Sequence, residues 1–190
     1  MMLNGKISEM LNRQLNAELQ SAYLYLAFEG YFDHINLGGF ANWYKVQALE
    51  EIDHAMIFYR YLAEQGENIT FDAIGAVSAE EMGMLDVLKE AKKHEQLVTD
   101  MINRIYGEAH DLKDWRTMKL LDWFIKEQAE EEKNADEMVQ KYLLFGLCDS
   151  CPDCSQELGG NDFGLCGGGL YSLNSELAAR VHTVPEYPLA

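Results

Sequence analysis

Hydrophobic residues recur at three- and four-residue spacing along four long stretches of the chain, which is the pattern of amphipathic helices. Proline is absent before Pro152, and glycines gather at Gly38-Gly39, Gly66, Gly75, Gly83 and from Gly146 onward, so these residues mark the boundaries. The expected helices span Ile7–Asp33, Gly39–Gln65, Leu85–His110 and Lys113–Phe145. No stretch alternates apolar and polar residues as a strand would, so the pattern predicts an all-α four-helix bundle.

The lengths of the connections predict the topology of this bundle. A few residues join the first helix to the second and the third to the fourth, which favours two antiparallel hairpins. The segment "GENITFDAIGAVSAEEMGM" between the hairpins has about nineteen residues and reaches roughly 60 Å when extended. It is long enough to cross the whole bundle, so the second and third helices are expected to run parallel.

The remainder of the chain divides into three shorter parts. Residues 1–146 are expected to form the bundle, and the segment 147–169 is a cysteine-rich insertion. Residues 170–182 are expected to form a short fifth helix, with Ser172 as a candidate N-cap. Residues 183–190 are expected to be a tail whose last five residues form a loose end.

Each of the four long helices carries one glutamate on its apolar stripe, near mid-length, where an aliphatic residue would normally lie. These residues are Glu18, Glu51, Glu95 and Glu131. A buried carboxylate without a partner costs several kcal/mol or takes up a proton, so four at one level require positive charge. No lysine or arginine lies on the stripes at this level, so a metal is expected there. Four glutamates would balance two divalent cations.

His54 follows Glu51 by three residues and therefore lies on the same helix face. An oxygen-rich ligand set with one imidazole suits Fe(II) or Mn(II) better than Zn(II). A single glutamate on a helix is usually solvated, and a single histidine is usually a satisfied core residue. The coincidence of four such positions with a Glu-x-x-His pair favours the metal site over that interpretation.

The amino-acid composition adds one feature to this prediction, an excess of acidic over basic side chains. The 190 residues include 32 acidic and 15 basic side chains, a formal charge of -17. This excess argues against nucleic acid or an anionic membrane as partner and favours cations, although solubility alone is an alternative explanation. Neither a signal peptide nor a transmembrane run is apparent, so a cytoplasmic protein is expected.

Five motifs make the chain resemble the prokaryotic non-haem ferritins: "LNRQLNAEL", "ALEEIDHAMIFYRYL", "KKHEQLVTDMIN", "WFIKEQAEEEK" and "GLYSLNSEL". The resemblance implies a ferritin-like bundle with one long crossover and a short fifth helix. It also implies a ferroxidase centre, in which Glu18, Glu51 and His54 hold one iron. Glu51 bridges to a second iron held with Glu95 and Glu131.

Further residues take roles by the same resemblance. Gln128 is placed to bind the oxygen-derived species, and Tyr25 matches a tyrosine that lends an electron or a hydrogen bond, with ordinary packing as the alternative. Trp123 matches a position near the centre, where packing is again the alternative. An accessory third iron site maps onto Glu50, Glu127 and Glu130, and a plain solvated acidic face is the alternative for these three.

Two departures separate the chain from neighbouring families. Bacterioferritins and rubrerythrins carry a second Glu-x-x-His motif, whereas this chain has Gln128-x-x-Glu131. Bacterioferritins bind haem through a methionine at the position of Ile52, and isoleucine cannot ligate iron. A non-haem storage ferritin is therefore favoured.

The implied function is iron storage and detoxification, with Fe(II) oxidised by O2 or H2O2 and ferric mineral kept inside a homo-oligomeric shell of 24 subunits. The alternative enzyme is a rubrerythrin-like or other di-iron oxidase or peroxidase that builds no cage. A plain metal buffer or a zinc-bearing interaction protein is the non-enzymatic alternative.

All four cysteines lie in the insertion: Cys148, Cys151, Cys154 and Cys166. Clustered cysteines in a reducing compartment favour a zinc or iron-sulfur centre, with redox-active thiols or an inert loop as alternatives. The spacing is similar to Cys-x2-Cys-x2-Cys iron-sulfur runs and does not match paired Cys-x2-Cys zinc modules. A centre there would suit a redox partner.

Overall fold

The computed structural model describes residues 3–146 and 167–189, which form helices and connecting loops. The helices of this part of the chain are α1 (Gly5–His34), α2 (Gly38–Glu64), α3 (Met84–Asp111), α4 (Trp115–Gly146) and α5 (Gly167–Leu177). The expected all-α fold with a short fifth helix is confirmed. The four cysteines and most of the predicted insertion lie outside the described residues.

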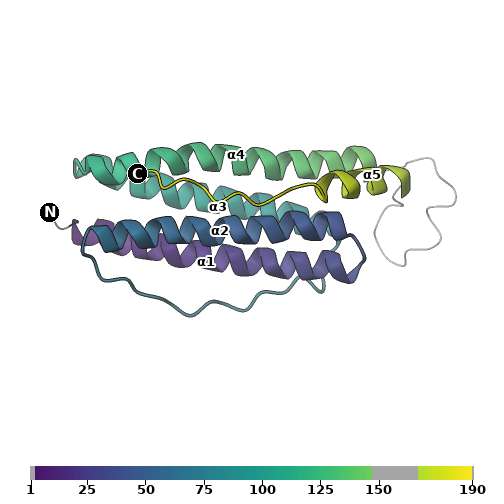
Figure 1. Ribbon diagram of the computed structural model, residues 1–190, viewed down its shortest axis with the longest axis horizontal. Helices are drawn as coiled ribbons and strands as arrows, with labels where there is room; N and C mark the ends of the chain where they lie inside the picture. The colour runs from purple at the N-terminus through teal and green to yellow at the C-terminus, as the bar shows by residue number, and fades with distance from the viewer. Residues whose placement is uncertain (1–2, 147–166, 190) are drawn as a thin grey trace.

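The hairpins and the crossover have the predicted arrangement. In Figure 1 the α1–α2 hairpin lies beside the α3–α4 hairpin, and the connection from α2 to α3 runs the whole length of the bundle. The second and third helices therefore start at the same end and run parallel. Both tight hairpin turns contain a residue in the left-handed region, Asn36 with φ 61° and Lys113 with φ 58°, a conformation often found just after a helix ends.

Polar side chains on one face of α1 hold the crossover in place. Asn12 Oδ1 accepts from the backbone N–H of Thr70 at 2.8 Å, and Asn16 Oδ1 accepts from that of Asp72 at 2.7 Å. Gln20 Oε1 accepts from the N–H of Gly75 at 2.6 Å. Because Asn12, Asn16 and Gln20 are spaced by four residues, they form one row along the helix. The row satisfies backbone groups of a segment that has no secondary structure of its own.

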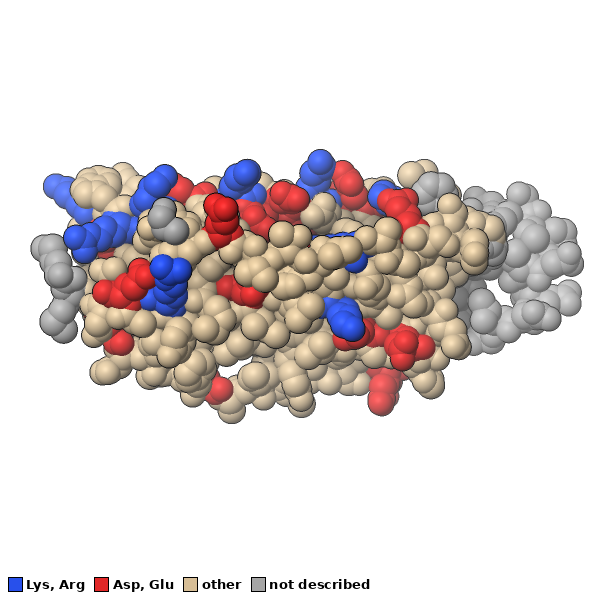
Figure 2. Space-filling model, viewed as in Figure 1, with Lys and Arg blue, Asp and Glu red and all other residues tan. Residues whose placement is uncertain are grey.

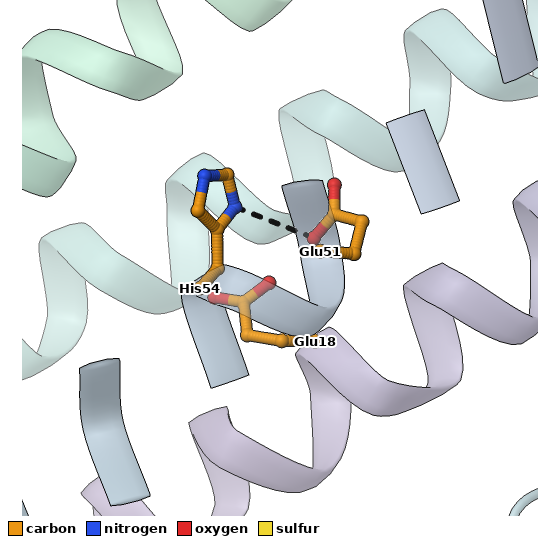
Figure 3. Close-up of side chains that lie close together, drawn as sticks. All are labelled: Glu18, Glu51 and His54. Atoms are coloured by element: carbon orange, nitrogen blue, oxygen red, sulfur yellow. Dashed lines mark ion pairs between the residues drawn. The ribbon is translucent and has the colours of Figure 1, made fainter. Parts of the chain in front are cut away.

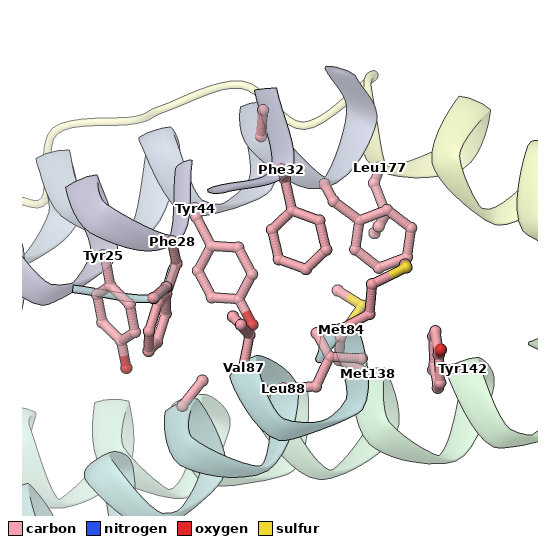
Figure 4. Close-up of a cluster of buried hydrophobic side chains, with 14 of the residues drawn as sticks. Tyr25, Phe28, Phe32, Tyr44, Met84, Val87, Leu88, Met138, Tyr142 and Leu177 are labelled. Carbon is pink, nitrogen blue, oxygen red and sulfur yellow. The ribbon is translucent and has the colours of Figure 1, made fainter. Parts of the chain in front are cut away.

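The apolar core is divided into two clusters along the bundle. The cluster in Figure 4 includes Phe28, Phe32, Tyr44, Met84 and Leu177, so α5 closes this end of the core. The second cluster is centred on rings such as Phe58 and Phe124, whose centroids lie 4.2 Å apart. Between the two clusters the core is polar, and this level carries the candidate site.

The segment after α5, residues 178–189, lies against the bundle, and we call it the C-terminal strap. Figure 1 shows it running back along the bundle beside α2. Tyr187 and Leu189 pack against the second core cluster. Tyr187 also donates to Glu64 at 2.8 Å and lies 3.8 Å beneath the guanidinium of Arg60. The expectation of a loose end is therefore wrong, because aromatic and ionic contacts secure this segment.

α5 ends at Leu177, before the predicted limit of the fifth helix at residue 182. The residues after Leu177 belong instead to the strap, where Asn42 Nδ2 donates to the carbonyls of Leu177 at 3.2 Å and of Arg180 at 2.9 Å. These bonds replace the helical ones that the carbonyls would otherwise accept.

Surface charge is mixed rather than uniformly acidic on the face shown in Figure 2. Acidic and basic side chains alternate along the edge formed by α4, and a broad area nearer α1 and α2 is uncharged. None of the described helices combines the length and the apolarity needed to cross a bilayer.

Candidate metal centre

Four glutamates, one from each long helix, are buried at the polar level between the two core clusters. Their exposed fractions are 1% for Glu18, 2% for Glu51, 2% for Glu95 and 4% for Glu131. The apolar stripe of each helix brings its glutamate inward because residues three and four positions apart share one face. The sequence pattern therefore placed all four glutamates correctly in the core.

The carboxylates of Glu18 and Glu51 and the imidazole of His54 form one compact group. Each of the three residues offers a ligand atom, and these atoms lie within 4.8 Å of one another. Figure 3 shows the side chain from α1 facing the two from α2. His54 Nδ1 lies 3.6 Å from Glu51 Oε2, too far for a good hydrogen bond. Two oxygens and a nitrogen at this separation form an open coordination site.

The carboxylates of Glu95 and Glu131 complete the polar level from α3 and α4. Burial and then the negative charge of Glu95 raise the pKa of Glu131 to about 8. Burial, followed by Glu95 and Glu131, raises the pKa of Glu51 well above its usual value. The two groups therefore lie close enough to Glu51 for all three charges to repel one another.

No lysine or arginine compensates this charge, because none is buried among residues 3–144 and 168–189. Burial also raises the pKa of Glu18, with Glu51 as the next cause. Without a cation the four carboxyls are therefore driven towards protonation. A pair of divalent cations would reverse that preference.

Glutamine side chains donate hydrogen bonds to the carboxylates of Glu18 and Glu131 and hold them in place. Gln14 Nε2 donates to Glu18 Oε1 at 2.9 Å, and Gln47 Nε2 donates to Glu131 Oε2 at 2.9 Å. The carboxylate oxygens left without a hydrogen bond include Glu18 Oε2 and Glu51 Oε2, both fully buried. Orphaned buried oxygens are rare in native proteins. Here they fit metal ligands.

The supporting roles of Gln14 and Gln47 were not predicted from the sequence. Gln14 lies four residues before Glu18 on the same helix face, so the spacing contained the signal. The partner of Gln47 is on another helix, and spacing within one helix cannot identify it. His94 was likewise missed: its Nε2 lies 2.7 Å from Ser21 Oγ, and its ring packs edge-on against Tyr25.

Tyr25, Gln128 and Trp123 all lie beside the group. The Tyr25 hydroxyl donates to Glu95 Oε1. Gln128 Nε2 donates to Glu95 Oε2 and to Thr99 Oγ1, both at 3.3 Å. Gln128 and Thr99 also line a pocket of about 380 Å³ between α3 and α4. The Trp123 ring packs edge-on against His54, with centroids 5.6 Å apart, which limits the rotation of the imidazole.

The three residues of the expected accessory site lie outside the buried core. Glu50 and Glu127 are partly buried, and Glu130 is exposed. The carboxylate of Glu127 contributes to the raised pKa of Glu50, so these two are close in space. Glu50 is also bound by Arg180, whose Nη2 lies 2.5 Å from Glu50 Oε2. This ion pair was not predicted, because its two residues are 130 positions apart in the chain.

Family comparison matches residues 8–144 to the ferritin-like domain. A bacterial non-heme ferritin of Staphylococcus epidermidis is 32% identical over 179 residues, covering 94% of this chain and 97% of the relative. A probable bacterial non-heme ferritin-like protein of Haemophilus influenzae is 32% identical over 145 residues, covering 76% of this chain and 88% of the relative.

Solved structures give the same result. An open-pore ferritin of the hyperthermophilic archaeon Archaeoglobus fulgidus aligns with a TM-score of 0.81 and 35% identity, covering 94% of this chain and 98% of that chain. A form of the same ferritin engineered to be closed aligns with a TM-score of 0.82 and 34% identity, covering 95% of this chain and 99% of that chain.

Proposed function

The chain belongs to the ferritin family, and on this premise we propose that it stores iron by oxidising Fe(II) at the buried glutamate site and retaining Fe(III) in a cage. The observation that carries the proposal is a core level with four buried carboxylates and one imidazole, and with no buried lysine or arginine among the residues that the structure describes. This arrangement is costly for a structural core and favourable for two divalent cations.

We assign Glu18, Glu51 and His54 to one Fe(II), and Glu51, Glu95 and Glu131 to the other. Glu51 is the shared ligand, which is supported by its proximity to His54 and by the repulsion it experiences from Glu95 and Glu131. The oxygen-rich set with a single nitrogen suits Fe(II). Iron is here the substrate that the site binds, oxidises and releases.

The protein's part in the oxidation is to hold two reducing ions next to each other. Two Fe(II) ions supply two electrons together, so O2 is reduced with two protons to H2O2 without release of a one-electron oxygen radical. A second iron pair can reduce H2O2 to water. Gln14 orients the carboxylate of Glu18, and Gln47 orients that of Glu131. Tyr25 and Gln128 both orient the carboxylate of Glu95. Such supporting hydrogen bonds usually tune metal affinity and activity.

The acidic composition supports storage as well as oxidation. Four carboxylates balance the charge of two divalent ions, so the site carries excess positive charge once both irons are Fe(III). This excess favours release of Fe(III) towards an acidic interior. We propose a homo-oligomeric shell of 24 subunits, in line with the nearly complete alignment to Archaeoglobus ferritin. The same alignment favours this function over a rubrerythrin-like oxidase that forms no cage.

The double variant Glu51→Ala with His54→Ala tests the oxidation. We expect the initial rate of aerobic Fe(II) oxidation, followed by ferric absorbance, to fall at least about tenfold. The matched control is His110→Ala with Asp111→Ala, which removes an imidazole and a carboxylate from an exposed pair. An unchanged rate in the first variant contradicts the proposed site. A mass near that of a monomer or dimer on size-exclusion chromatography contradicts the cage.

A further inference from the structure

Arg180 of the C-terminal strap is held on three sides beside the metal-binding level. Its guanidinium lies 4.0 Å above the ring of Trp43, and its Nη1 donates to the Trp43 carbonyl at 3.4 Å. Its Nη2 contacts Glu50 Oε2 at 2.5 Å, and the two side chains are only 17% and 21% exposed. A partly buried ion pair stacked on an aromatic ring is far more ordered than a surface salt bridge.

The strap is anchored on both sides of this arginine. Asn42 Nδ2 donates to the backbone carbonyl of Leu177 at 3.2 Å, before Arg180, and to that of Arg180 itself at 2.9 Å. Two residues further on, His182 Nε2 lies 2.7 Å from Asp53 Oδ2 on α2. Figure 1 shows the strap following α2 over this region. The guanidinium is therefore placed by the backbone on either side, and not by the ion pair alone.

Glu50 has the environment of a cation ligand. It directly precedes the shared ligand Glu51 in the chain, and only 21% of its side chain is exposed. Arg180 is the basic residue whose side chain contacts the Glu50 carboxylate. Arginine keeps its charge at any physiological pH, and its planar fork matches a carboxylate. The guanidinium thus already supplies the positive charge that Glu50 requires.

We propose that Arg180 acts as a fixed cation in the accessory position beside Glu50, so that Glu50 does not bind metal while the strap is seated. The inference rests on the proposed function, because it concerns how many divalent ions the iron site takes. The core level then holds two ions tightly in the wild-type chain, and a third ion has to compete with the guanidinium for Glu50. Arg180 is in this sense a residue that determines the metal stoichiometry.

The test is an anaerobic calorimetric titration of the assembled protein with Fe(II) alone, counting the tight ions per chain. We expect two in the wild type and three in Arg180→Gln, and the added ion should disappear when Glu50→Gln is combined with Arg180→Gln. Arg180→Met is the second variant, because it keeps an apolar stem over Trp43 if the glutamine variant folds poorly. Circular dichroism checks that both remain helical.

Arg60→Gln is the matched control. Arg60 also stacks on a strap aromatic ring and pairs with a glutamate, Glu64, but at the far end of α2. It should leave the count at two. Three tight ions in the wild type, two in both Arg180 variants, or three in Arg60→Gln would each overturn the inference. Loss of the two wild-type ions would instead remove the proposed function, since the effect of Arg180 is measured as a difference of one ion.

Discussion

Replacing Glu131 by glutamine is expected to stabilise the metal-free protein. Burial and the charge of Glu95 raise the pKa of Glu131 from 4.5 to about 8, so at pH 7 this group is protonated in the folded chain and ionised in the unfolded chain. At about 1.4 kcal/mol for each pH unit above 4.5, this difference lowers the free energy of unfolding by about 3 kcal/mol. Glutamine is neutral at every pH, and its carbonyl can still accept from Gln47 Nε2.

The sign of the effect follows from the direction of the pKa change. A carboxyl whose pKa is raised by folding stabilises the folded state least at high pH, because ionisation in the unfolded chain then opposes folding. The gain from Glu131→Gln should therefore be small at pH 4.5, increase with pH, and level off above about pH 8. At roughly 2–4 °C for each kcal/mol in a chain of this size, the melting temperature at pH 7 rises by roughly 6–12 °C.

Thermal unfolding in a chelating buffer at pH 4.5, 6, 7 and 8 measures this dependence. Glu137→Gln is the control, because Glu137 is an exposed residue of the same helix with only a 3.6 Å contact to Lys133; it should change the melting temperature little at any pH. Divalent metal should reverse the order, since the parent protein keeps a ligand that the variant has lost. No gain at pH 7, or an equal gain at pH 4.5 and pH 8, would refute the electrostatic reasoning.

Three further substitutions test the surroundings of the site and the fold. Gln47→Leu removes the hydrogen bond to Glu131 and should weaken divalent-metal binding about 10- to 100-fold in an anaerobic titration, whereas unchanged affinity would show that Gln47 only fills space. Tyr25→Phe removes the donor to Glu95 and should slow aerobic Fe(II) oxidation about tenfold with two ions still bound; an unaltered rate assigns Tyr25 to packing. Asp114→Ala removes the acceptor for the N–H and hydroxyl of Thr117 at the start of α4 and should lower the free energy of unfolding by about 1 kcal/mol in denaturant titrations, and no loss would exclude a capping role.

Helical periodicity explains why the core and the metal ligands could be predicted. The stripe of α1 runs through Ile7, Leu11 and Leu15 to Glu18, and every one of these residues is buried. A period of 3.6 residues fixes the angular position of each side chain on its own helix. The short and long connections predicted the order of the helices, and each glutamate lies near the middle of its helix, so the four were expected at one level.

Helical periodicity could not predict the hydrogen bonds and ion pairs that support the site. The partner of Gln47 is 84 residues away, and that of Arg180 is 130 residues away. Such pairs depend on the axial register of neighbouring helices and on the path of a strap without repeating pattern, and neither is encoded by spacing within a segment. The hydrogen bonds from Asn42 to the strap carbonyls could not be predicted for the same reason. They depend on the path that the chain takes after α5.

Anomalous diffraction at the iron edge, from crystals soaked anaerobically with Fe(II), shows directly whether the buried glutamates bind two irons. We expect two strong peaks per chain inside the bundle. One should lie among Glu18, Glu51 and His54, and the other among Glu51, Glu95 and Glu131. A single peak, or iron bound without contact to Glu51, would contradict the assignment of this buried level as a two-iron oxidation site.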